Sequence, residues 1–545
     1  MKSFAQWQAW WLERLLDTRL RSAALTCLDA SEIGSLNALL ALSSVWRAAA
    51  APGQRLHLVW LAESVSDIDD ALAKDCLPDW VAPPALPGLH RQVLANGAIT
   101  LLIGIGLSAG ARARLLDELV LAADLMVVDA LSREVDHLLA PEGQVLCAQT
   151  GQVRGRHGNL PAPNLITQAW LGARQRGVAT DAVVIGGGIC GLTTAAKLAR
   201  AGWSVTVLDA GGVHDGHLGA ALTPVVSSDD NSRSRLSRAG ALAADLFWRS
   251  LPGPVGLPCG ALQLQRPASE RRLVDLQSVA ERLDMPAWAQ WLETAQASDV
   301  AGVRLSRGAL WFPGGWVVLV NDLLARLRET PAVRCIQTTI SSLERAGGVW
   351  QARDFQGEVL ARGAVAVVAN AGDCLRLLAA SSIDHAGTRL EGLHRLAGEV
   401  TAIPASALAG GPRCVVGGDG YVLPSLSGWC VSGGTYQRGV DSAQCSDEGK
   451  ATNLARAGEL LGLSELTHQI DPQTLRGWAG WRAVLPGRLP AIGPVVGRPG
   501  LWVFTGGASR GLTWSALGAD LIAGAVAGEP IALESDLLKA VWPGF

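Results

Sequence analysis

The sequence predicts an α/β protein with a doubly wound N-terminal domain, a second, dinucleotide-binding-type domain and an antiparallel sheet interleaved with the second domain. Three observations lead to this prediction. Before about residue 160, short apolar segments alternate with amphipathic ones, which is typical of a doubly wound sheet. Residues 181–209 read as a strand, a glycine-rich turn, a helix and a second strand. Later strand-like segments are short and separated by Gly and Pro, which indicates antiparallel pairing.

Length and composition indicate a folded chain of more than one domain. The 545 residues exceed one ordinary core, and 49% hydrophobic against 17% charged residues excludes a disordered chain. A net charge of −3 gives no overall attraction to nucleic acid. Ten scattered cysteines without a C-x-x-C pair argue against a structural metal. The longest apolar run, residues 98–107, is shorter than the roughly 20 residues of a membrane span. We therefore expect neither a metal site nor a membrane-spanning segment. The N-terminus lacks a signal-peptide pattern, so we expect a cytoplasmic location.

Residues 1–160 are predicted to form the first domain. Its expected strands are residues 23–29, 56–61, 98–105, 125–128 and 144–148, and its expected helices are residues 7–21, 36–50, 67–74 and 109–122. Residues 151–164 have the Gly, Pro and Asn content of a loop. We therefore expect a linker at 161–178 and a second domain at 179–545.

The second domain opens on the strongest motif of the chain. Gly186, Gly188 and Gly191 form G-x-G-x-x-G directly after an apolar strand. These glycines allow a tight turn, close approach of a pyrophosphate and close helix–strand packing, with the phosphates at the helix N-terminus. Asp209 ends the next strand, where an acid binds a ribose hydroxyl. The pattern predicts a dinucleotide site.

Two later strands are expected to return to this sheet. Residues 364–369 lead to Gly372, and residues 501–505 lead to a second glycine-rich turn that contains Gly507, Arg510 and Gly511 before a helix. This second helix N-terminus could meet another polar part of the same cofactor. Between these strands, a substrate subdomain is expected over roughly residues 255–345 and 388–475.

The second domain resembles the FAD-dependent amine and amino acid oxidases. More closely, it resembles the oxidoreductase half of the bifunctional tRNA 5-methylaminomethyl-2-thiouridine biosynthesis proteins, over roughly residues 180–535. The resemblance lies in the segments 311–316 (WFPGGW), 397–400 (AGEV), 419–421 (DGY), 434–439 (GTYQRG), 489–493 (LPAIG) and 508–512 (ASRGL). The N-terminal region is similar to the methyltransferase half of that family, notably at residues 87–91.

The resemblance implies a cofactor and a substrate. The cofactor is FAD, and it is expected to be non-covalent because no cysteine lies near residues 506–512. The substrate is the wobble uridine of a tRNA anticodon with a carboxymethylaminomethyl group. Oxidation of its carbon–nitrogen bond and hydrolysis release glyoxylate and leave 5-aminomethyl-(2-thio)uridine.

The substrate carboxylate calls for an arginine. Arg482, Arg438 and Arg510 lie in or beside the matching segments, and Arg482 is the first choice. Tyr421 and Tyr436, the only tyrosines, are expected to orient the carboxylate or to be hydrogen-bonded core residues. The catalytic candidates are Arg482, Tyr436 and Arg438.

The sequence departs from the family pattern in both halves. The loop after the first strand, residues 29–37, keeps one glycine where a methyltransferase needs a glycine-rich loop for S-adenosylmethionine (SAM). Glu63 could still hold a ribose and Asp129 occupies the catalytic strand end, but the segment after Asp129 is shortened. The first domain is therefore predicted to be methyltransferase-like and degenerate, with SAM binding and methylation open. In the second half, the family pattern has small polar residues where this chain has Gly219-Ala220-Ala221. The family pattern also has an acidic residue before Leu489 where this chain has Gly487.

The tRNA would be held by clustered arginines. These candidates are Arg154, Arg156, Arg174, Arg176, Arg233, Arg235 and Arg238. Trp311, Trp316, Trp478 and Trp481 could stack a base or pack in the core.

Two other functions remain alternatives. A small-molecule oxidase of glycine, sarcosine or a related amine would act without tRNA. A non-enzymatic tRNA-binding module would carry the flavin fold without flavin.

Overall fold

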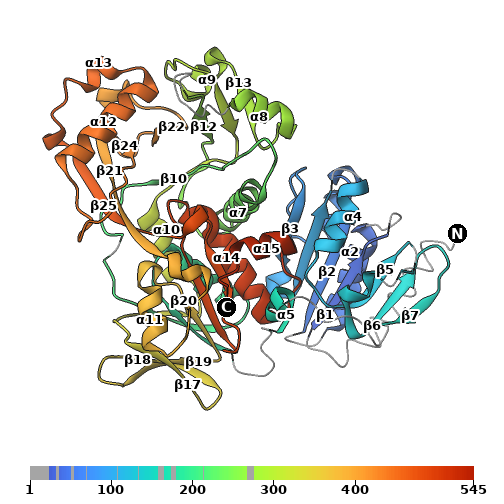
Figure 1. Ribbon diagram of the computed structural model, residues 1–545. Coiled ribbons are helices and arrows are strands. Elements are labelled where there is room, and N and C mark those ends of the chain that lie inside the picture. The colour runs from blue at the N-terminus through green and yellow to red at the C-terminus, as the bar shows by residue number, and fades with distance from the viewer. Residues whose placement is uncertain are drawn as a thin grey trace. The chain divides into compact units, whose positions relative to one another are not determined.

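The computed structural model describes residues 24–31, 36–50, 54–68, 70–106, 109–129, 131–132, 134–156, 165–172, 180–212, 214–266 and 275–544. The expected helix at 7–21 and the candidates Arg174 and Arg176 lie outside these residues. The contacts divide the chain into two compact units (Figure 1). The first unit comprises residues 1–178 and 520–540, and the second comprises residues 179–519 and 541–545.

The first unit is built on a seven-stranded sheet with the order β3-β4-β2-β1-β5-β6-β7. Five strands form a parallel centre, namely β1 (Ala24–Asp29), β2 (Arg55–Ala62), β4 (Ile99–Ile105), β5 (Ala123–Val128) and β6 (Leu139–Cys147). The antiparallel edges are β3 (Gly88–Leu94) and β7 (Val153–Gly155). The helices are α2 (Leu36–Ala49), α3 (Asp70–Cys76), α4 (Ala109–Glu118) and α5 (Leu165–Gly172). The five expected strands are confirmed, whereas the two edge strands were not anticipated.

Strand β2 explains why this sheet is buried on both faces. Leu56, Leu58 and Trp60 belong to one apolar cluster, and Val59 and Leu61 belong to the cluster on the other face. Alternate side chains of a strand point to opposite faces, so a continuous apolar strand requires cover on both sides. The doubly wound arrangement satisfies this requirement.

The C-terminal segment belongs to the first unit, which corrects the expected extent of the second domain. Residues 520–540 contain the end of α14 (Gly511–Ala527) and most of α15 (Ser535–Val541). On β3, Arg91 forms ion pairs with Asp520 (2.8 Å) and Glu529 (2.5 Å). Charged side chains this well buried require partners, and they join segments more than 400 residues apart in the chain. No local pattern in the sequence reports such a pairing.

The second unit contains a six-stranded sheet with the order β16-β9-β8-β20-β27-β26. Strands β8 (Asp181–Ile185), β9 (Ser204–Asp209), β16 (Val333–Gln337), β20 (Val365–Val368) and β27 (Leu501–Thr505) are parallel neighbours, and β26 (Ala491–Pro494) is the antiparallel edge. Helix α6 (Ile189–Arg200) joins β8 to β9. The predicted return of residues 364–369 and 501–505 to this sheet is confirmed.

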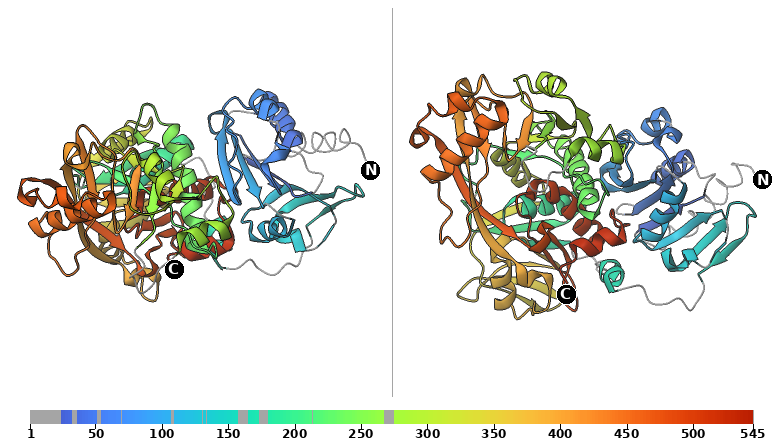
Figure 2. Two further views of the ribbon diagram at one scale, coloured as in Figure 1. Left: turned by 90° about the horizontal axis from the view of Figure 1, so that it is seen from above. Right: turned by 45° about the horizontal axis from the view of Figure 1, so that its top comes forward.

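An eight-stranded sheet forms the other layer of the second unit. Its order is β13-β14-β12-β22-β23-β24-β21-β25, and all but the β12–β22 pair are antiparallel. The long strands β21 (His394–Pro404) and β25 (Arg476–Val484) lie side by side (Figure 2). The bounds therefore differ from those expected: β25 lies beyond residue 475, whereas β16 belongs to the nucleotide-binding sheet because it pairs with β9.

The remaining elements connect or cover these sheets. The strands are β10 (Ala220–Leu222), β11 (Gly256–Leu257), β12 (Ala261–Leu264), β13 (Gln290–Leu292), β14 (Ala309–Phe312), β15 (Trp316–Val318), β17 (Ser342–Ala346), β18 (Val349–Arg353), β19 (Val359–Gly363), β22 (Val415–Gly418), β23 (Gly420–Val422) and β24 (Trp429–Gly433). The helices are α7 (Ser232–Arg249), α8 (Leu276–Leu283), α9 (Thr294–Ala301), α10 (Val320–Arg328), α11 (Cys374–Ala380), α12 (Asp447–Leu461) and α13 (Ser464–Thr467). Among the residues that the structure describes, no helix combines the length and apolarity needed to cross a bilayer.

Candidate active site

The turn between β8 and α6 has the geometry that its three glycines predict. Gly186 has φ +107°, a backbone conformation that favours glycine. A Cβ on Gly191 would lie 1.9 Å from the carbonyl oxygen of Gly186, so a side chain there would collide with the turn. Gly188 is the N-cap of α6, and among the described residues a Cβ there would meet only His214 Nε2, at 3.7 Å. The turn is closed at Gly191 and open at Gly188, where a phosphate would approach the helix.

Asp209 is held at the end of β9 by two backbone groups. Gly187 N–H donates to its Oδ1 (2.8 Å) and Gly211 N–H donates to its Oδ2 (3.1 Å). Because each carboxylate oxygen has two lone pairs, both oxygens can still accept a hydroxyl. The acid thereby fixes the turn and stays available to a ribose.

A second helix begins next to the first. A Cβ on Gly511, the first residue of α14, would lie 3.3 Å from the side chain of Ile189, the first residue of α6. Gly507 lies in the turn between β27 and α14, and Gly372 lies in the turn after β20. The side chain of Thr505, at the end of β27, donates to the carbonyl of Ala371 (2.8 Å) and ties these two turns together. Two helix N-termini thus converge at the carboxyl ends of parallel strands, which fits an anionic dinucleotide.

Two histidines at this site were missed by the sequence analysis. His214 stacks on Trp478 (centroids 6.2 Å apart, interplanar angle 16°), and His217 contacts the same ring at 4.2 Å. Burial, His214 and Arg482 lower the pKa of His217 to about 4, and burial also lowers the pKa of His214. Both imidazoles are therefore uncharged at neutral pH. Two histidines three residues apart after the ribose acid were a weak signal, because their partner Trp478 is distant in the sequence.

Arg482 and the two tyrosines come together on the eight-stranded sheet. The Arg482 guanidinium lies 4.7 Å above the ring of Tyr436, and its Nη1 donates to the carbonyl of Thr435 (3.0 Å). A Cβ on Gly398 would lie 1.6 Å from Nη1, so this glycine makes room for the guanidinium. Burial raises the pKa of Tyr421 to about 12, and the nearby charge of Arg482 acts in the opposite direction. The structure thus brings together three of the residues that the sequence singled out.

The other two candidate arginines differ from each other. Arg438 is exposed in the loop after Tyr436. Arg510 donates from Nη1 to the carbonyl of Thr223 (2.7 Å), and burial lowers its pKa to about 10. Only Arg510 is built into the interior of the site.

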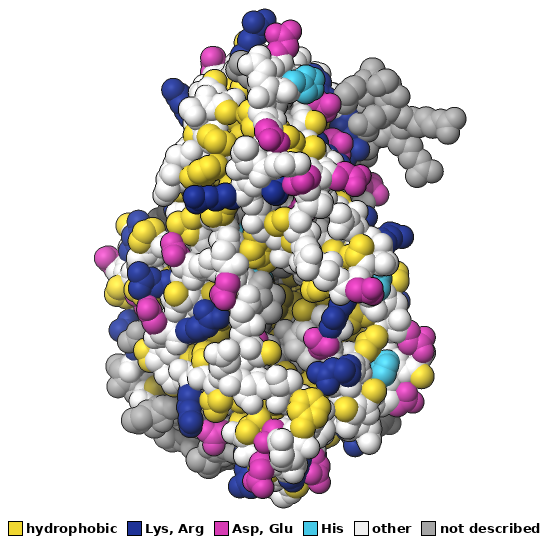
Figure 3. Space-filling model, turned by 90° about the vertical axis from the view of Figure 1, so that its left-hand side faces the viewer, with side chains coloured by type: hydrophobic (Ala, Val, Ile, Leu, Met, Phe, Trp, Pro, Cys, Tyr) yellow, Lys and Arg dark blue, Asp and Glu magenta, His cyan; other side chains and the backbone are white. Residues whose placement is uncertain are grey.

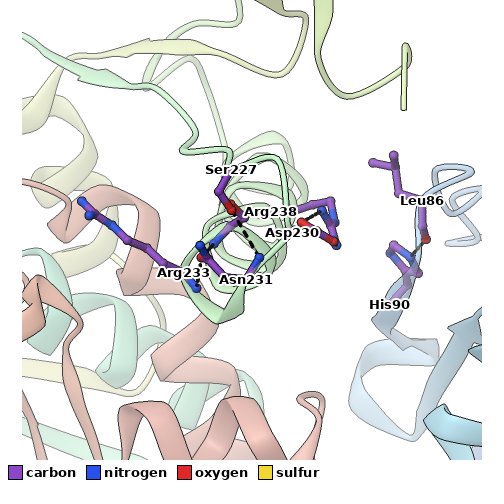
Figure 4. A network of polar contacts seen from close by, with 8 residues as sticks. Leu86, His90, Ser227, Asp230, Asn231, Arg233 and Arg238 are labelled. Atoms are coloured by element: carbon purple, nitrogen blue, oxygen red, sulfur yellow. Dashed lines mark hydrogen bonds and ion pairs between the residues drawn. The ribbon is translucent and has the colours of Figure 1, made fainter. Parts of the chain in front are cut away.

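The candidate tRNA contacts are only partly at the surface. Arg238 is 4% exposed and forms two hydrogen bonds of 2.9 Å with Asp230 (Figure 4). Arg154 pairs with the buried Asp136. For Arg238 an RNA contact is the wrong interpretation, because its buried guanidinium is held by a carboxylate, whereas the partly exposed Arg154 stays a candidate. On the face shown in Figure 3, basic and acidic side chains are intermixed and form no single-sign patch.

The tryptophan candidates also divide. Trp316 is buried, donates to Asp245 (2.8 Å) and packs edge-on against Trp248, so it is a core residue. Trp481 is 37% exposed. Trp478 contacts the two histidines of the site.

The first unit shows a different turn after its first strand. Asp29, at the end of β1, is buried and accepts from Ser31 N–H (3.1 Å) and from the Ser31 hydroxyl (2.8 Å). Residues 32–35 lie outside the described residues. Asp129 follows β5 and its carbonyl accepts from the thiol of Cys147 (3.1 Å). In the described part of this turn, the backbone N–H and the hydroxyl of Ser31 both donate to Asp29 Oδ1.

Comparison with known proteins places the second unit among flavoproteins. Residues 181–525 match the family model of FAD dependent oxidoreductases. Two proteins with the name tRNA 5-methylaminomethyl-2-thiouridine biosynthesis bifunctional protein are similar to nearly the whole chain. The one from Cupriavidus metallidurans is 32% identical over 92% of this chain and 86% of its own length. The one from Ralstonia nicotianae is 33% identical over 87% of this chain and 81% of its own length.

Two solved structures share the fold of the second unit. Glycine oxidase from Geobacillus kaustophilus has a TM-score of 0.54 at 20% identity, over 67% of this chain and 98% of its own. Iminodiacetate oxidase from Chelativorans sp. BNC1 has a TM-score of 0.51 at 22% identity, over 66% of this chain and 98% of its own. The predicted amino acid oxidase-like fold and the FAD cofactor are confirmed, and the second unit is an FAD-dependent oxidoreductase.

Proposed function

The chain belongs to the family of tRNA 5-methylaminomethyl-2-thiouridine biosynthesis bifunctional proteins, and on that premise we propose that its second unit oxidises the carboxymethylaminomethyl group of a tRNA wobble uridine. The CH–NH unit of the substituent would give up a hydride from carbon and a proton from nitrogen and become a C=N bond, with FAD as the acceptor of the two electrons. Water would then add to the oxidised carbon, and the carbon–nitrogen bond would break. Glyoxylate leaves, and 5-aminomethyl-(2-thio)uridine remains on the tRNA. Cytoplasmic tRNA would be the substrate.

The observation that carries the proposal is the position of Arg482. It lies over Tyr436 in the same unit as a turn that fits a dinucleotide. The substituent on the uridine is an N-substituted glycine, so it presents one carboxylate to a forked guanidinium. We assign Arg482 to that carboxylate, with Tyr421 and Tyr436 beside it. Because His217 is uncharged at neutral pH, it does not compete with Arg482 for the carboxylate.

The cofactor site is assigned to the two converging helix N-termini. Gly186, Gly188 and Gly191 shape the turn for the pyrophosphate, and Asp209 accepts a ribose hydroxyl. Gly372, Gly507, Arg510 and Gly511 lie after the neighbouring strands β20 and β27, where they would hold the flavin part of the cofactor. When bound, FAD supplies the two-electron oxidation of the substrate carbon. His214 Nε2, which faces Gly188, would donate to a phosphate oxygen.

We assign no SAM-dependent methyltransferase activity to the first unit. Its turn after β1 has one glycine within residues 29–37, and Asp29 is already bonded to Ser31. A SAM-binding loop requires backbone that a cofactor can approach closely. We therefore expect the reaction to stop at the aminomethyl nucleoside.

The test is incubation of the purified protein with carboxymethylaminomethyl-bearing tRNA, with and without SAM, followed by nucleoside mass spectrometry. Conversion to the aminomethyl nucleoside supports the proposal, and a further methyl group with SAM would contradict the assignment of the first unit. A parallel reaction with glycine and sarcosine tests the small-molecule alternative. Flavin reduction by those amines without conversion of tRNA would replace the proposed function by that alternative. A purified protein without flavin would favour the non-enzymatic module.

A further inference from the structure

Glu399 is a buried acid of the eight-stranded sheet, on the strand next to Arg482. Strand β21 pairs with β25 in a register that places Leu396 opposite Arg482. Because every second side chain of a strand shares a face, Gly398 lies on the Arg482 face and Glu399 lies on the opposite one. A Cβ on Gly398 would meet the Arg482 guanidinium, whereas the side chain of Glu399, which is 2% exposed, meets helix α12. Two consecutive residues of β21 thus serve the two faces of the sheet.

The carboxylate of Glu399 is held at the N-terminus of α12. Ser446, the N-cap residue of this helix, donates from its backbone N–H to Glu399 Oε2 (2.8 Å). A Cβ on Gly449, in the first helical turn, would lie 1.5 Å from Glu399 Oε1, so this glycine leaves the space that the carboxylate fills. A negative charge at a helix N-terminus is favourable. These contacts bind the side chain of Glu399 to α12.

The backbone of Glu399 holds the loop that follows β24. Its N–H donates to Thr435 Oγ1 (3.0 Å), and its carbonyl accepts from Thr435 N–H (3.1 Å). The carbonyl of Thr435 in turn accepts from Arg482 Nη1 (3.0 Å). The next residue of the loop, Tyr436, places its ring below the Arg482 guanidinium. Thr435 therefore connects the backbone of Glu399 to the guanidinium.

Helix α12 holds the same loop at a second point. Arg456 Nη1 donates to the carbonyl of Gly434 (3.2 Å), the residue before Thr435. Asn453 Nδ2 donates to the carbonyl of Glu399 (3.3 Å). Helix α12 is therefore bonded both to β21 and to the loop that carries Tyr436.

We propose that Glu399 is a positioning residue for the carboxylate site. Its contacts with α12 fix the backbone that sets, through Thr435, the direction of the Arg482 guanidinium. This inference rests on the proposed function, in which Arg482 binds the substrate carboxylate. Forked recognition of a carboxylate requires two parallel N–H···O bonds, so a small rotation of the guanidinium weakens it. Without the Glu399 carboxylate, Arg482 would keep its charge and lose its fixed orientation.

The test measures binding of methoxyacetate to the flavin-loaded protein, from the change in flavin absorption. This probe has the carboxylate of the substituent, but an ether oxygen replaces the amine, so it cannot form a C=N bond. Glu399→Ala should bind it roughly tenfold more weakly, with the flavin content of the wild type. Gly449→Ala should show a similar loss, because the new Cβ displaces the carboxylate although alanine favours a helix. Glu399→Gln keeps an acceptor for Ser446 N–H, so its affinity should fall at most about twofold.

Thr401→Val is the matched control. Thr401 lies on the same strand and face as Glu399, and its hydroxyl accepts from Asn453 Nδ2 of α12 (3.1 Å). Loss of this bond should lower stability to denaturant without changing methoxyacetate binding. A fall in affinity that follows the loss of stability in all variants, Thr401→Val included, would reduce Glu399 to a structural role and overturn the inference.

Two further outcomes separate this inference from the proposed function. Equal affinity of the wild type and Glu399→Ala, with a clear loss in Arg482→Leu, would overturn the role of Glu399 and leave the assignment of Arg482 in place. Equal affinity of the wild type and Arg482→Leu would refute the assignment of Arg482 itself, and the inference with it.

Discussion

Each unit of this chain contains a mostly parallel sheet, and the residues that follow one buried strand differ between the two sheets. Helix α2 is the next helix after β1 and α6 is the next helix after β8, and residues 32–35 before α2 lie outside the described residues. After β8, Gly186 and Gly191 bring the backbone close together and leave the helix N-terminus open at Gly188. After β1, the side chain of Asp29 is tied to Ser31. The comparison teaches that a doubly wound sheet alone does not define a cofactor site, which depends on a few residues in the turn.

The largest effect is expected from closing the second unit's turn. In Gly191→Ala, the new Cβ would lie 1.9 Å from the backbone carbonyl oxygen of Gly186, and a backbone atom cannot yield as a side chain can. We expect FAD to bind about 1000-fold more weakly, or about 4 kcal/mol, which is severe overpacking. The ratio of flavin to protein absorbance measures this loss. Gly314→Ala is the control, because no atom of the part of the chain that the structure describes lies within 4 Å of a Cβ there. Full flavin content in Gly191→Ala would show that the close approach of Gly191 to Gly186 is not required for FAD binding.

The next effect concerns stability of the first unit. Arg91→Met removes the guanidinium nearest to the buried Asp520 and Glu529 and leaves Glu529 with the longer ion pair to Arg55 (3.5 Å). Because removing one partner of a buried ion pair is costly, the free energy of unfolding should fall by about 3 kcal/mol. Denaturant unfolding of the whole chain measures this change. Arg47→Met, at an exposed arginine that donates to the carbonyl of Cys76, should change stability little. A similar loss in both variants would show that the buried pairs have no special role.

A third substitution separates the substrate from the cofactor within the second unit. Arg482→Leu removes the guanidinium above Tyr436 but leaves the turn after β8 intact. We expect kcat/KM for the modified nucleoside to fall roughly 50-fold, the loss of one charge-assisted interaction of about 2–3 kcal/mol, with flavin content unchanged. Arg476→Leu, on the same strand but over the ring of Trp429, is the matched control. Unchanged kcat/KM in Arg482→Leu would show that another arginine binds the substrate carboxylate.

The smallest effect is a pH dependence at His217. Its pKa is about 4 in the folded protein, because of burial and then the charges of His214 and Arg482, against an ordinary value of 6.5. Between these two pH values the unfolded state binds the additional proton, so stability is full above pH 6.5 and is lost as pH falls toward 4. We expect this loss to be about 1–2 kcal/mol smaller in His217→Gln. Denaturant unfolding at a series of pH values provides the measurement, with the exposed His394→Gln as control. Parallel curves for wild type and His217→Gln would contradict the assignment.

The sequence by itself determined the local units of this protein. The alternation of strands and helices in the first unit, the turn from Gly186 to Gly191 and the acid at Asp209 all follow from spacing within about 30 residues. Periodicity and glycine positions report such features because they depend on backbone conformation and on the burial of one strand or helix. Motif order also identified Arg482, Tyr421 and Tyr436, although it did not establish that their side chains meet.

The tertiary structure alone decided which distant side chains share one place. Arg91 pairs with Asp520 and Glu529, His214 and His217 pack on Trp478, and Arg482 lies over Tyr436. It also showed that Arg238, which sequence reasoning assigned to RNA, is bound to Asp230 inside the unit. Such pairings depend on burial and on the partner that each charge finds after packing, and no local pattern along the chain encodes them.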